Sequence, residues 1–325
     1  LCDVRLSLDK VPIMRKQGAK IGRELEALFS RQPEILRALL EAVKTRSEDV
    51  KWLEPHVQTI VDVVSEVIGC VDASRGIDQG LHCEVRPYFI KALREYTGDP
   101  DSEVETWFVN GAPLGIEEEP GDCNIFPKYP DDGLTEDPAN LASEELQGKR
   151  SSAENDADAI EEIKNLTAKG WLRKFRSKTA AKRFLRGRVI LSRLIVITKE
   201  RKVKKKGKIE VKKKKRLILN LKRSGITSVA RKSERPELPR VLDVVFAMLE
   251  LLRSIRGQPR RHLRQLVLDF VHAFFNFPGT PGERRYFATR LRNDIYVWLR
   301  IAQGSRGAPM ICGRALAQAM RMACC

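Results

Sequence analysis

Asp269 ends a short apolar run, Leu266 to Leu268, that has the pattern of a buried strand. A carboxylate at the end of a strand is suited to hold a divalent metal, because magnesium prefers oxygen ligands. Nucleotidyl transfer depends on such metals more than on covalent help from the protein, since the metals align the attacking hydroxyl with the triphosphate. Taken alone, Asp269 is more simply explained as a cap of the turn that follows it.

A second motif that could take part in this chemistry is a glycine-rich turn, Gln303–Pro309, which leads into a helix-like run. Gly304 and Gly307 allow a tight turn and a close approach of other backbone. Asp269 is followed by Ala273 and Phe274, so the chain reads Asp-x-x-x-Ala-Phe and then Gln-Gly-x-x-Gly-x-Pro. This order resembles the first two palm motifs of reverse transcriptases, most of all those of retroelements with long terminal repeats.

The resemblance implies a role for each matching residue. Asp269 would be catalytic and would bind Mg²⁺ or Mn²⁺. The aromatic ring of Phe274 would lie against the sugar of the incoming nucleotide and exclude a 2′-hydroxyl. The alternative is a core aromatic, which is the role expected of Phe275. Gln303 would lie next to the sugar and base, with a surface turn residue as the alternative. The pocket would be lined by Phe270, Ala273, Phe274, Gln303 and Gly304.

The run Arg216–Gly225 looks like the Arg-x-x-x-Asp-x-Arg strand of the fingers in the same family. Arg216 would grip the triphosphate, a role suited to a planar and permanently charged guanidinium. Lys199 is the nearest match to the lysine that shares this task. Two residues depart from the family pattern: Asn220 replaces an aspartate, and His272 stands where an acidic residue is usual.

The segment Lys199–Arg216 contains twelve lysines and arginines against Glu200 and Glu210, with Gly207 suited to the tip of a hairpin. Contact with nucleic-acid phosphates is expected, and a solvated basic surface or a nuclear import signal are the alternatives. The lysines expected to contact nucleic acid are Lys204, Lys205, Lys206, Lys212, Lys213, Lys214 and Lys215.

The charge of the chain is divided unevenly. The whole chain has a net charge of +17, but residues 1–150 have −11 and residues 151–325 have +28. Such an asymmetry indicates modules with different partners, and the basic half has the character of a polyanion binder. Seven scattered cysteines without a C-x-x-C pair indicate reduced thiols in an intracellular protein, in cytoplasm or nucleus. No apolar run approaches the roughly 20 residues that span a bilayer, so no membrane partner is expected.

The predicted fold is α+β, with the fingers and part of the palm of a right-hand polymerase behind a mainly helical N-terminal module. The predicted domains are an acidic helical module at 1–116 with no identified partner, a flexible acidic linker at 117–156, and the polymerase part at 157–325. Helices are expected at 18–49 with a break at Pro33, and at 57–71, 85–96, 157–166, 241–252 (buried) and 309–323. Strands are expected at 192–198, 217–219, 266–269, 285–289 and 296–301.

The predicted function is that of a reverse transcriptase segment from a retrotransposon polyprotein, acting on an RNA or DNA template-primer with deoxynucleotides and two Mg²⁺. The family has an aromatic-x-Asp-Asp turn after these motifs, and the sixteen residues that follow Pro309 do not form one. We therefore expect this polypeptide to be unable to polymerise. A non-catalytic nucleic-acid-binding remnant of a retroelement is the alternative, and a third possibility makes the N-terminal half an assembly module.

Overall fold

A computed structural model describes residues 10–45, 51–75, 85–130, 137–141, 152–205, 208–237, 241–254, 256 and 272–323. Within 201–215 only the course of the backbone is described. Over these ranges the chain is a mixed α+β structure with small antiparallel sheets, and its N-terminal part is mainly helical, as predicted.

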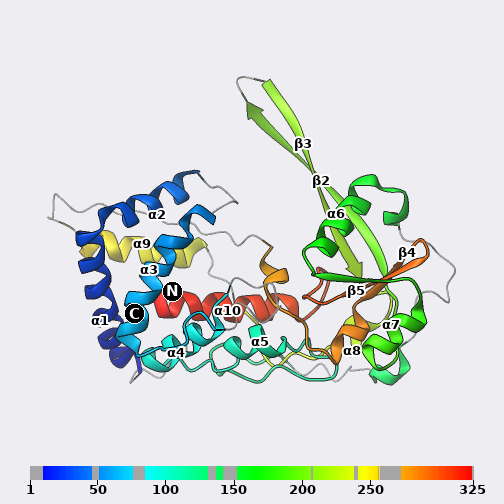
Figure 1. Cartoon of the computed structure of the whole chain (residues 1–325), viewed down its shortest axis with the longest axis horizontal. Helices are drawn as coiled ribbons and strands as arrows, with labels where there is room; N and C mark the ends of the chain where they lie inside the picture. Colours follow the sequence, from blue (N-terminus) through cyan, green and yellow to red (C-terminus); the bar gives the residue numbers. More distant parts are fainter. Residues whose placement is uncertain are drawn as a thin grey trace.

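The N-terminal part is built from amphipathic helices that pack on one another. α1 contacts α2, α3 and α4, and α4 contacts α5 (Figure 1). Helix α3 ends at Gly69 and α4 at Gly98, both in the left-handed conformation that glycine adopts at low cost. The elements are α1 (Lys10–Arg31), α2 (Pro33–Thr45), η1 (Lys51–Leu53), α3 (Glu54–Ile68), α4 (Pro87–Thr97), α5 (Val104–Asn110) and η2 (Pro138–Asn140).

The C-terminal part combines a long hairpin with a small sheet. β2 pairs with β3 over their full length, while β1, β5 and β4 form an antiparallel sheet in that order. Asp156 and Ser177 cap the helices that follow them. The elements are η4 (Ser152–Asn155), α6 (Ala157–Ala168), β1 (Leu172–Phe175), α7 (Lys178–Leu185), β2 (Arg193–Lys205), β3 (Lys208–Asn220), α8 (Ile226–Val229), α9 (Val241–Ser254), η5 (Ala273–Asn276), η6 (Glu283–Tyr286), β4 (Ala288–Leu291), β5 (Asp294–Trp298) and α10 (Ala308–Ala323).

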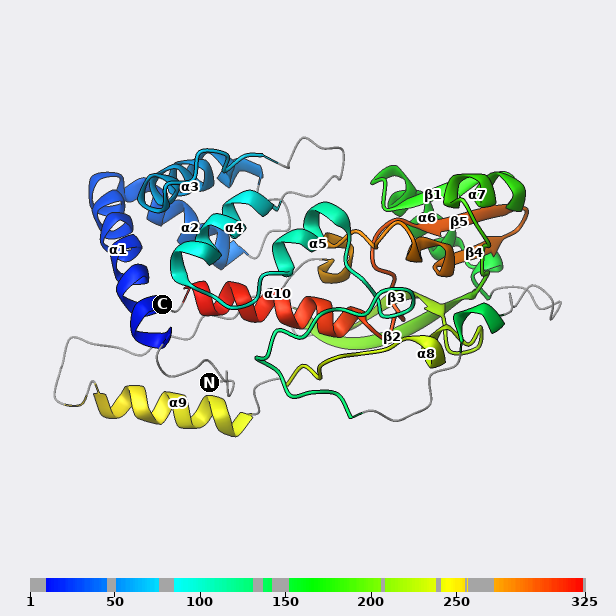
Figure 2. The same cartoon turned by 90° about the horizontal axis from the view of Figure 1, so that it is seen from below.

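Two features organise the molecule in space. The hairpin of β2 and β3 projects well beyond the other elements (Figure 1). Helix α10 runs from the base of this hairpin towards α1, and it contacts α1, α4 and α5 (Figure 2). One buried core includes Trp107 and Leu114 from the N-terminal side together with Leu219 and Met310 from the C-terminal side. The core therefore extends across the predicted boundary at residue 116.

The acidic segment predicted as a linker is packed in its first part. Cys123, Ile125 and Phe126 are buried there and form a small cluster. Residues 131–136 and 142–151 lie outside the described residues, and the division into modules stays a prediction.

Most of the predicted helices and the hairpin are confirmed, but the prediction that 241–252 is buried is wrong. In α9 the side chains of Val241 and Phe246 are 79% and 63% exposed, and Figure 2 shows this helix set apart from the other elements. The segment that follows it, 257–271, lies outside the described residues. No helix in the described ranges is long and apolar enough to cross a membrane.

Candidate nucleotide and nucleic-acid site

The glycine-rich turn lies directly against the base of the hairpin. The backbone N–H of Leu219 donates to the carbonyl of Gln303 at 3.0 Å. Gly304 has φ of +109°, and a Cβ added there would lie 2.3 Å from the carbonyl oxygen of Leu219 and 3.1 Å from Cγ2 of Ile218. Only glycine fits this position, because a side chain would collide with backbone and would also strain the turn. The two predicted motifs are therefore in contact.

The register of the hairpin shows which of its faces meets the turn. Ile218 faces Gly304, and residues two apart in a strand share a face, so Arg216 lies on that face about 7 Å further out. Directly opposed residues also share a face, and Lys199 is paired with Lys214. Arg216 and Lys199, predicted to hold triphosphate, thus lie on the same face of the hairpin as Ile218, while the Gln303–Gly304 turn is bonded to the outer edge of β3 beside Ile218. We call the face that holds Ile218 the turn-side face.

Several cross-strand pairs on the turn-side face consist of two basic residues. The cross-strand pairs 199/214, 201/212 and 205/208 each place two basic residues opposite one another. On the other face, Lys213 is opposite Glu200, and Lys202 and Lys204 are opposite Val211 and Ile209. Like charges directly opposed weaken a hairpin, and a bound polyanion would relieve them. Of the predicted nucleic-acid-binding lysines, Lys205, Lys212 and Lys214 are on the turn-side face, Lys204, Lys213 and Lys215 are on the other, and Lys206 lies outside the described residues.

The residues around the predicted metal ligand are described only from His272 onward. Asp269 and Phe270 lie outside the described residues, as does the strand predicted to precede them. Downstream, Phe274 is half-buried and packs against the main core, while Ala273 lines an apolar cavity of about 230 Å³ between α4, α5 and α10. Phe275 is buried and stacks on Trp171 with ring centroids 4.9 Å apart, which confirms it as a core aromatic. No cluster of three or more metal-ligating side chains occurs within the described ranges.

Two further residues from the sequence patterns, Asn220 and Tyr129, have defined contacts. Asn220 accepts a hydrogen bond from the backbone N–H of Arg223 at 3.3 Å, so the residue that replaces the family's aspartate shapes the turn after β3. An aromatic-x-Asp-Asp string occurs upstream of β2, at residues 129–132. Tyr129 there bonds to the backbone of Ser233 and lies under the guanidinium of Arg306, a residue of the glycine-rich turn. The two aspartates lie outside the described residues.

A buried carboxylate fixes the loop that follows α5. Glu283 is 1% exposed, and it accepts hydrogen bonds from the backbone N–H groups of Leu114 (2.5 Å), Ile116 (2.8 Å), Glu117 (2.9 Å) and Glu118 (3.3 Å). Burial raises the pKa of Glu283, while these four amide donors oppose the shift. This arrangement could not be predicted from the sequence, because nothing local to Glu283 marks it as buried.

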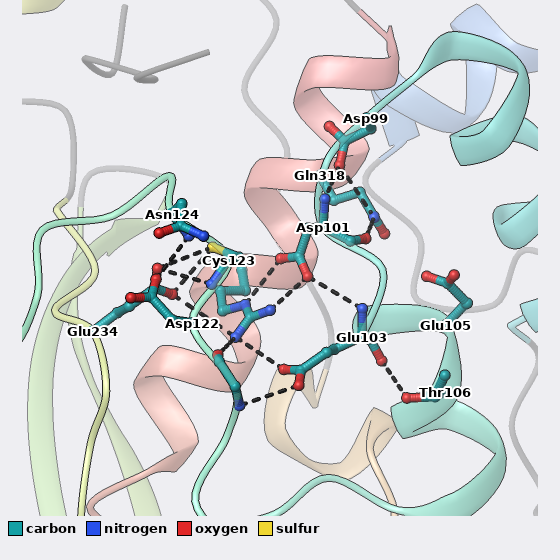
Figure 3. A network of polar contacts seen from close by, with 12 residues as sticks. Asp99, Asp101, Glu103, Glu105, Thr106, Asp122, Cys123, Asn124, Glu234 and Gln318 are labelled. Carbon is teal, nitrogen blue, oxygen red and sulfur yellow. Dashed lines mark hydrogen bonds and ion pairs between the residues drawn. The ribbon is translucent and has the colours of Figure 1, made fainter. Parts of the chain in front are cut away.

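A second buried network joins α10 to the segment between α4 and α5 (Figure 3). Arg314 forms a two-pronged ion pair with Asp101, with its Nε 2.9 Å from Oδ2 and a terminal nitrogen 2.6 Å from Oδ1. One turn and two turns further along α10, Gln318 and Arg321 bind Asp99. Burial lowers the pKa of Arg314, but the hydrogen bonds and charge of Asp101 outweigh it, so the pKa is raised overall.

Glu234 lies beside this network and is fully buried. The backbone N–H of Cys123 donates to its carboxyl group at 3.0 Å, and the Cys123 thiol lies 3.1 Å from Oε2. Arg314 is 3.8 Å away. Burial raises the pKa of the Cys123 thiol to about 12, and burial together with the nearby carboxyl of Asp122 raises the pKa of Glu234 to about 7.

The raised pKa of Glu234 predicts a pH dependence of stability. Below pH 4.5, the ordinary pKa of a glutamate, the Glu234 carboxyl is neutral in both the folded and the unfolded chain. Between pH 4.5 and about 7 it loses its proton only in the unfolded chain. The stabilisation present at low pH is therefore lost as the pH rises to about 7, by an amount on the order of 2–3 kcal/mol.

Urea unfolding of the wild type and of Glu234→Gln at a series of pH values measures this dependence. The wild type should gain stability relative to the variant as the pH is lowered from about 7.5 to about 5, because the amide does not titrate. A difference between the two proteins that stays constant with pH would contradict the assignment.

Comparisons with protein-family models, with curated proteins and with solved structures found no match.

Proposed function

We propose that residues 157–325 are the fingers and the first part of the palm of a reverse transcriptase, within a retrotransposon polyprotein. The observation that supports this most directly is the contact between two sequence motifs far apart in the chain. The Gln303–Gly304 turn lies against the outer edge of β3 at the base of a basic hairpin, beside Ile218, and Arg216 and Lys199 are on the face of the hairpin to which Ile218 belongs. A nucleotide triphosphate needs such a combination of fixed backbone and cationic side chains.

In this proposal the intact enzyme transfers nucleotides from deoxynucleoside triphosphates to a primer on an RNA or DNA template. Arg216 and Lys199 hold the triphosphate, Gln303 with Gly304 shapes the floor beside the sugar, and Phe274 selects against the 2′-hydroxyl. Asp269 would hold Mg²⁺, which neutralises charge on the phosphates when it is bound.

A second candidate function is favoured by the like-charged pairs of the turn-side face. They suit the binding of nucleic-acid phosphates whether or not chemistry follows, so a non-catalytic nucleic-acid-binding remnant of a retroelement would use the same face. The two candidates differ in whether a deoxynucleotide is bound.

Calorimetric titration of the chain with dTTP in the presence of Mg²⁺ separates them. We expect binding that is lost in Asp269→Ala and in Arg216→Gln, because the first removes the metal ligand and the second removes the phosphate grip. Arg235→Gln is the matched control, since the ion pair between the Arg235 side chain and Glu237 is exposed. Oligonucleotide binding without any dTTP binding would support the remnant.

Primer extension by this polypeptide should not be detectable. The sixteen residues after Pro309 contain no aromatic-x-Asp-Asp turn, and the string at 129–132 precedes the fingers, contrary to the order in the family. Two-metal chemistry needs carboxylates on both sides of the metals. Extension that is abolished by Asp269→Ala would show that the missing ligands are supplied from elsewhere in the chain.

A further inference from the structure

Three polar residues on one face of α10 are bound by a short acidic segment that precedes α5. Arg314, Gln318 and Arg321 are spaced by four and three residues, so they lie along one side of the helix. All three are at most 8% exposed, and their partners Asp99 and Asp101 are 2% and 1% exposed. Gln318 donates to the carbonyl of Asp101 at 2.6 Å as well as to Asp99.

The acidic segment is itself held in a fixed shape. The backbone N–H of Asp101 donates to Asp99 at 3.1 Å, and that of Glu103 donates to Asp101 at 3.4 Å. Glu103 reaches Arg314 at 3.2 Å and accepts from the backbone N–H of Gly121 at 3.1 Å. The guanidinium of Arg314 also lies over the ring of Trp107, 4.7 Å from its centre. Arg314 is therefore surrounded by groups from the N-terminal side of the molecule.

Burying two ion pairs is a costly way to stabilise a fold. Apolar residues of similar size often stabilise as well or better, because the charges lose their hydration. What ion pairs with two-pronged geometry provide is a defined distance and orientation between the elements that they join. Here the elements are the N-terminal segment and the helix that begins directly after the glycine-rich turn.

The same N-terminal region also touches the start of α10. A Cβ on Gly307 would lie 2.9 Å from the carbonyl oxygen of Leu114, so the two backbones are in close contact there. Leu114 is in turn fixed by Glu283. Arg314 is six residues beyond Ala308, about 9 Å along the helix. The helix is thus held at its first turn and again along its length by residues 99–118.

We propose that the acidic segment Asp99–Glu103 is a positioning element of the nucleotide site, which sets the place of α10 and thereby of the Gln303–Gly304 turn against the hairpin. The inference rests on the proposed function, because it takes this turn as part of the nucleotide pocket. In this proposal the N-terminal half helps to position the nucleotide site and is not a module with a separate function.

The test compares Asp101→Asn, which keeps the shape but removes the charge, with Asp72→Asn. Asp72 is the matched control, since its ion pair with Arg75 is exposed on both sides. Calorimetry gives the affinity for dTTP with Mg²⁺, and fluorescence anisotropy gives the affinity for a labelled single-stranded oligonucleotide. Hydrogen exchange followed by mass spectrometry reports on the peptides that contain Leu219 and residues 300–310.

We expect Asp101→Asn to weaken dTTP binding by about tenfold to a hundredfold, as expected when a binding group is displaced by about 1 Å. Oligonucleotide affinity should stay within about twofold, because the hairpin lysines belong to β2 and β3 and not to α10 or the acidic segment. Exchange should rise at Leu219 and in 300–310 but not in the sheet of β1, β5 and β4. Unchanged dTTP affinity with unchanged exchange would overturn the proposal, and so would a uniform rise in exchange, which indicates general destabilisation.

A second variant covers the case in which Asp101→Asn does not fold. Arg314→Lys keeps the buried charge but loses the two-pronged geometry, so it should show the same selective loss of dTTP affinity in a folded protein. If the proposed function itself is wrong, the result is different, because the wild type would also bind no dTTP. The exchange measurement still decides in that case whether the acidic segment positions the turn.

Discussion

Glu283→Ala should lower the free energy of unfolding of the chain by roughly 2–6 kcal/mol, since two buried donors lose their partner and each costs about 1–3 kcal/mol. Four backbone N–H groups converge on this carboxylate, and alanine would leave them without an acceptor. Water can reach the N–H groups of the exposed Glu117 and Glu118, but those of Leu114 and Ile116 belong to residues that are only 1% and 5% exposed. Urea unfolding followed by circular dichroism measures the loss.

Two further variants make this result specific. Glu283→Gln retains one carbonyl oxygen and should lose less stability than Glu283→Ala. Glu237→Ala removes an exposed carboxylate and should change stability by less than about 1 kcal/mol. If Glu283→Ala and Glu237→Ala unfold at the same urea concentration, the carboxylate does not hold the loop.

The double variant Lys212→Gln with Lys214→Gln should lose about tenfold to thirtyfold of its affinity for single-stranded nucleic acid at about 0.15 M salt. Both positions are on the turn-side face, where they stand opposite Arg201 and Lys199. Removing two phosphate contacts should also reduce the slope of log affinity against log salt by about 1.4. Fluorescence anisotropy over a range of salt concentrations gives both quantities.

The hairpin provides its own control for this experiment. Lys213→Gln with Lys215→Gln makes the same change in charge one residue away, on the other face, where Lys213 is opposite Glu200. We expect this variant to bind several-fold more tightly than the first. Equal losses in the two variants would mean that the lysines act only through the total charge of the hairpin.

Local patterns were enough to predict much of the fold. The β-branched run at 192–198 and the helix after the glycine-rich turn follow from periodicity and turn chemistry, and both are present. The strand Leu172–Phe175 was missed, because a four-residue run with two central basic residues has no clear alternation. It exists because β5 pairs with it along its whole length.

The polar contacts of the interior could not be predicted in the same way. Arg314 and Arg321 occupy positions on an amphipathic helix that would ordinarily face solvent. Nothing near them in the sequence identifies Asp101 and Asp99 as their partners. The predicted nucleotide-site residues are only partly placed: Gln303 and Gly304 contact the base of the hairpin, Arg216 and Lys199 lie further out on it, Phe274 packs against the core, and Asp269 is outside the described residues. Motif spacing indicates which residues belong to one site, but not what holds them in position.

The network around Arg314 has a consequence for the order of folding. Asp101 and its partner are separated by 213 residues, and Asp99 and Arg321 by 222. On the ribosome, the two aspartates leave the exit tunnel long before the arginines are made, so their burial must wait until α10 has been synthesised. Loop closure of this length is slow, and an early compact state would have to hold the carboxylates in water. The N-terminal helices can form early, but they reach their final packing only when α10 supplies their counter-charges.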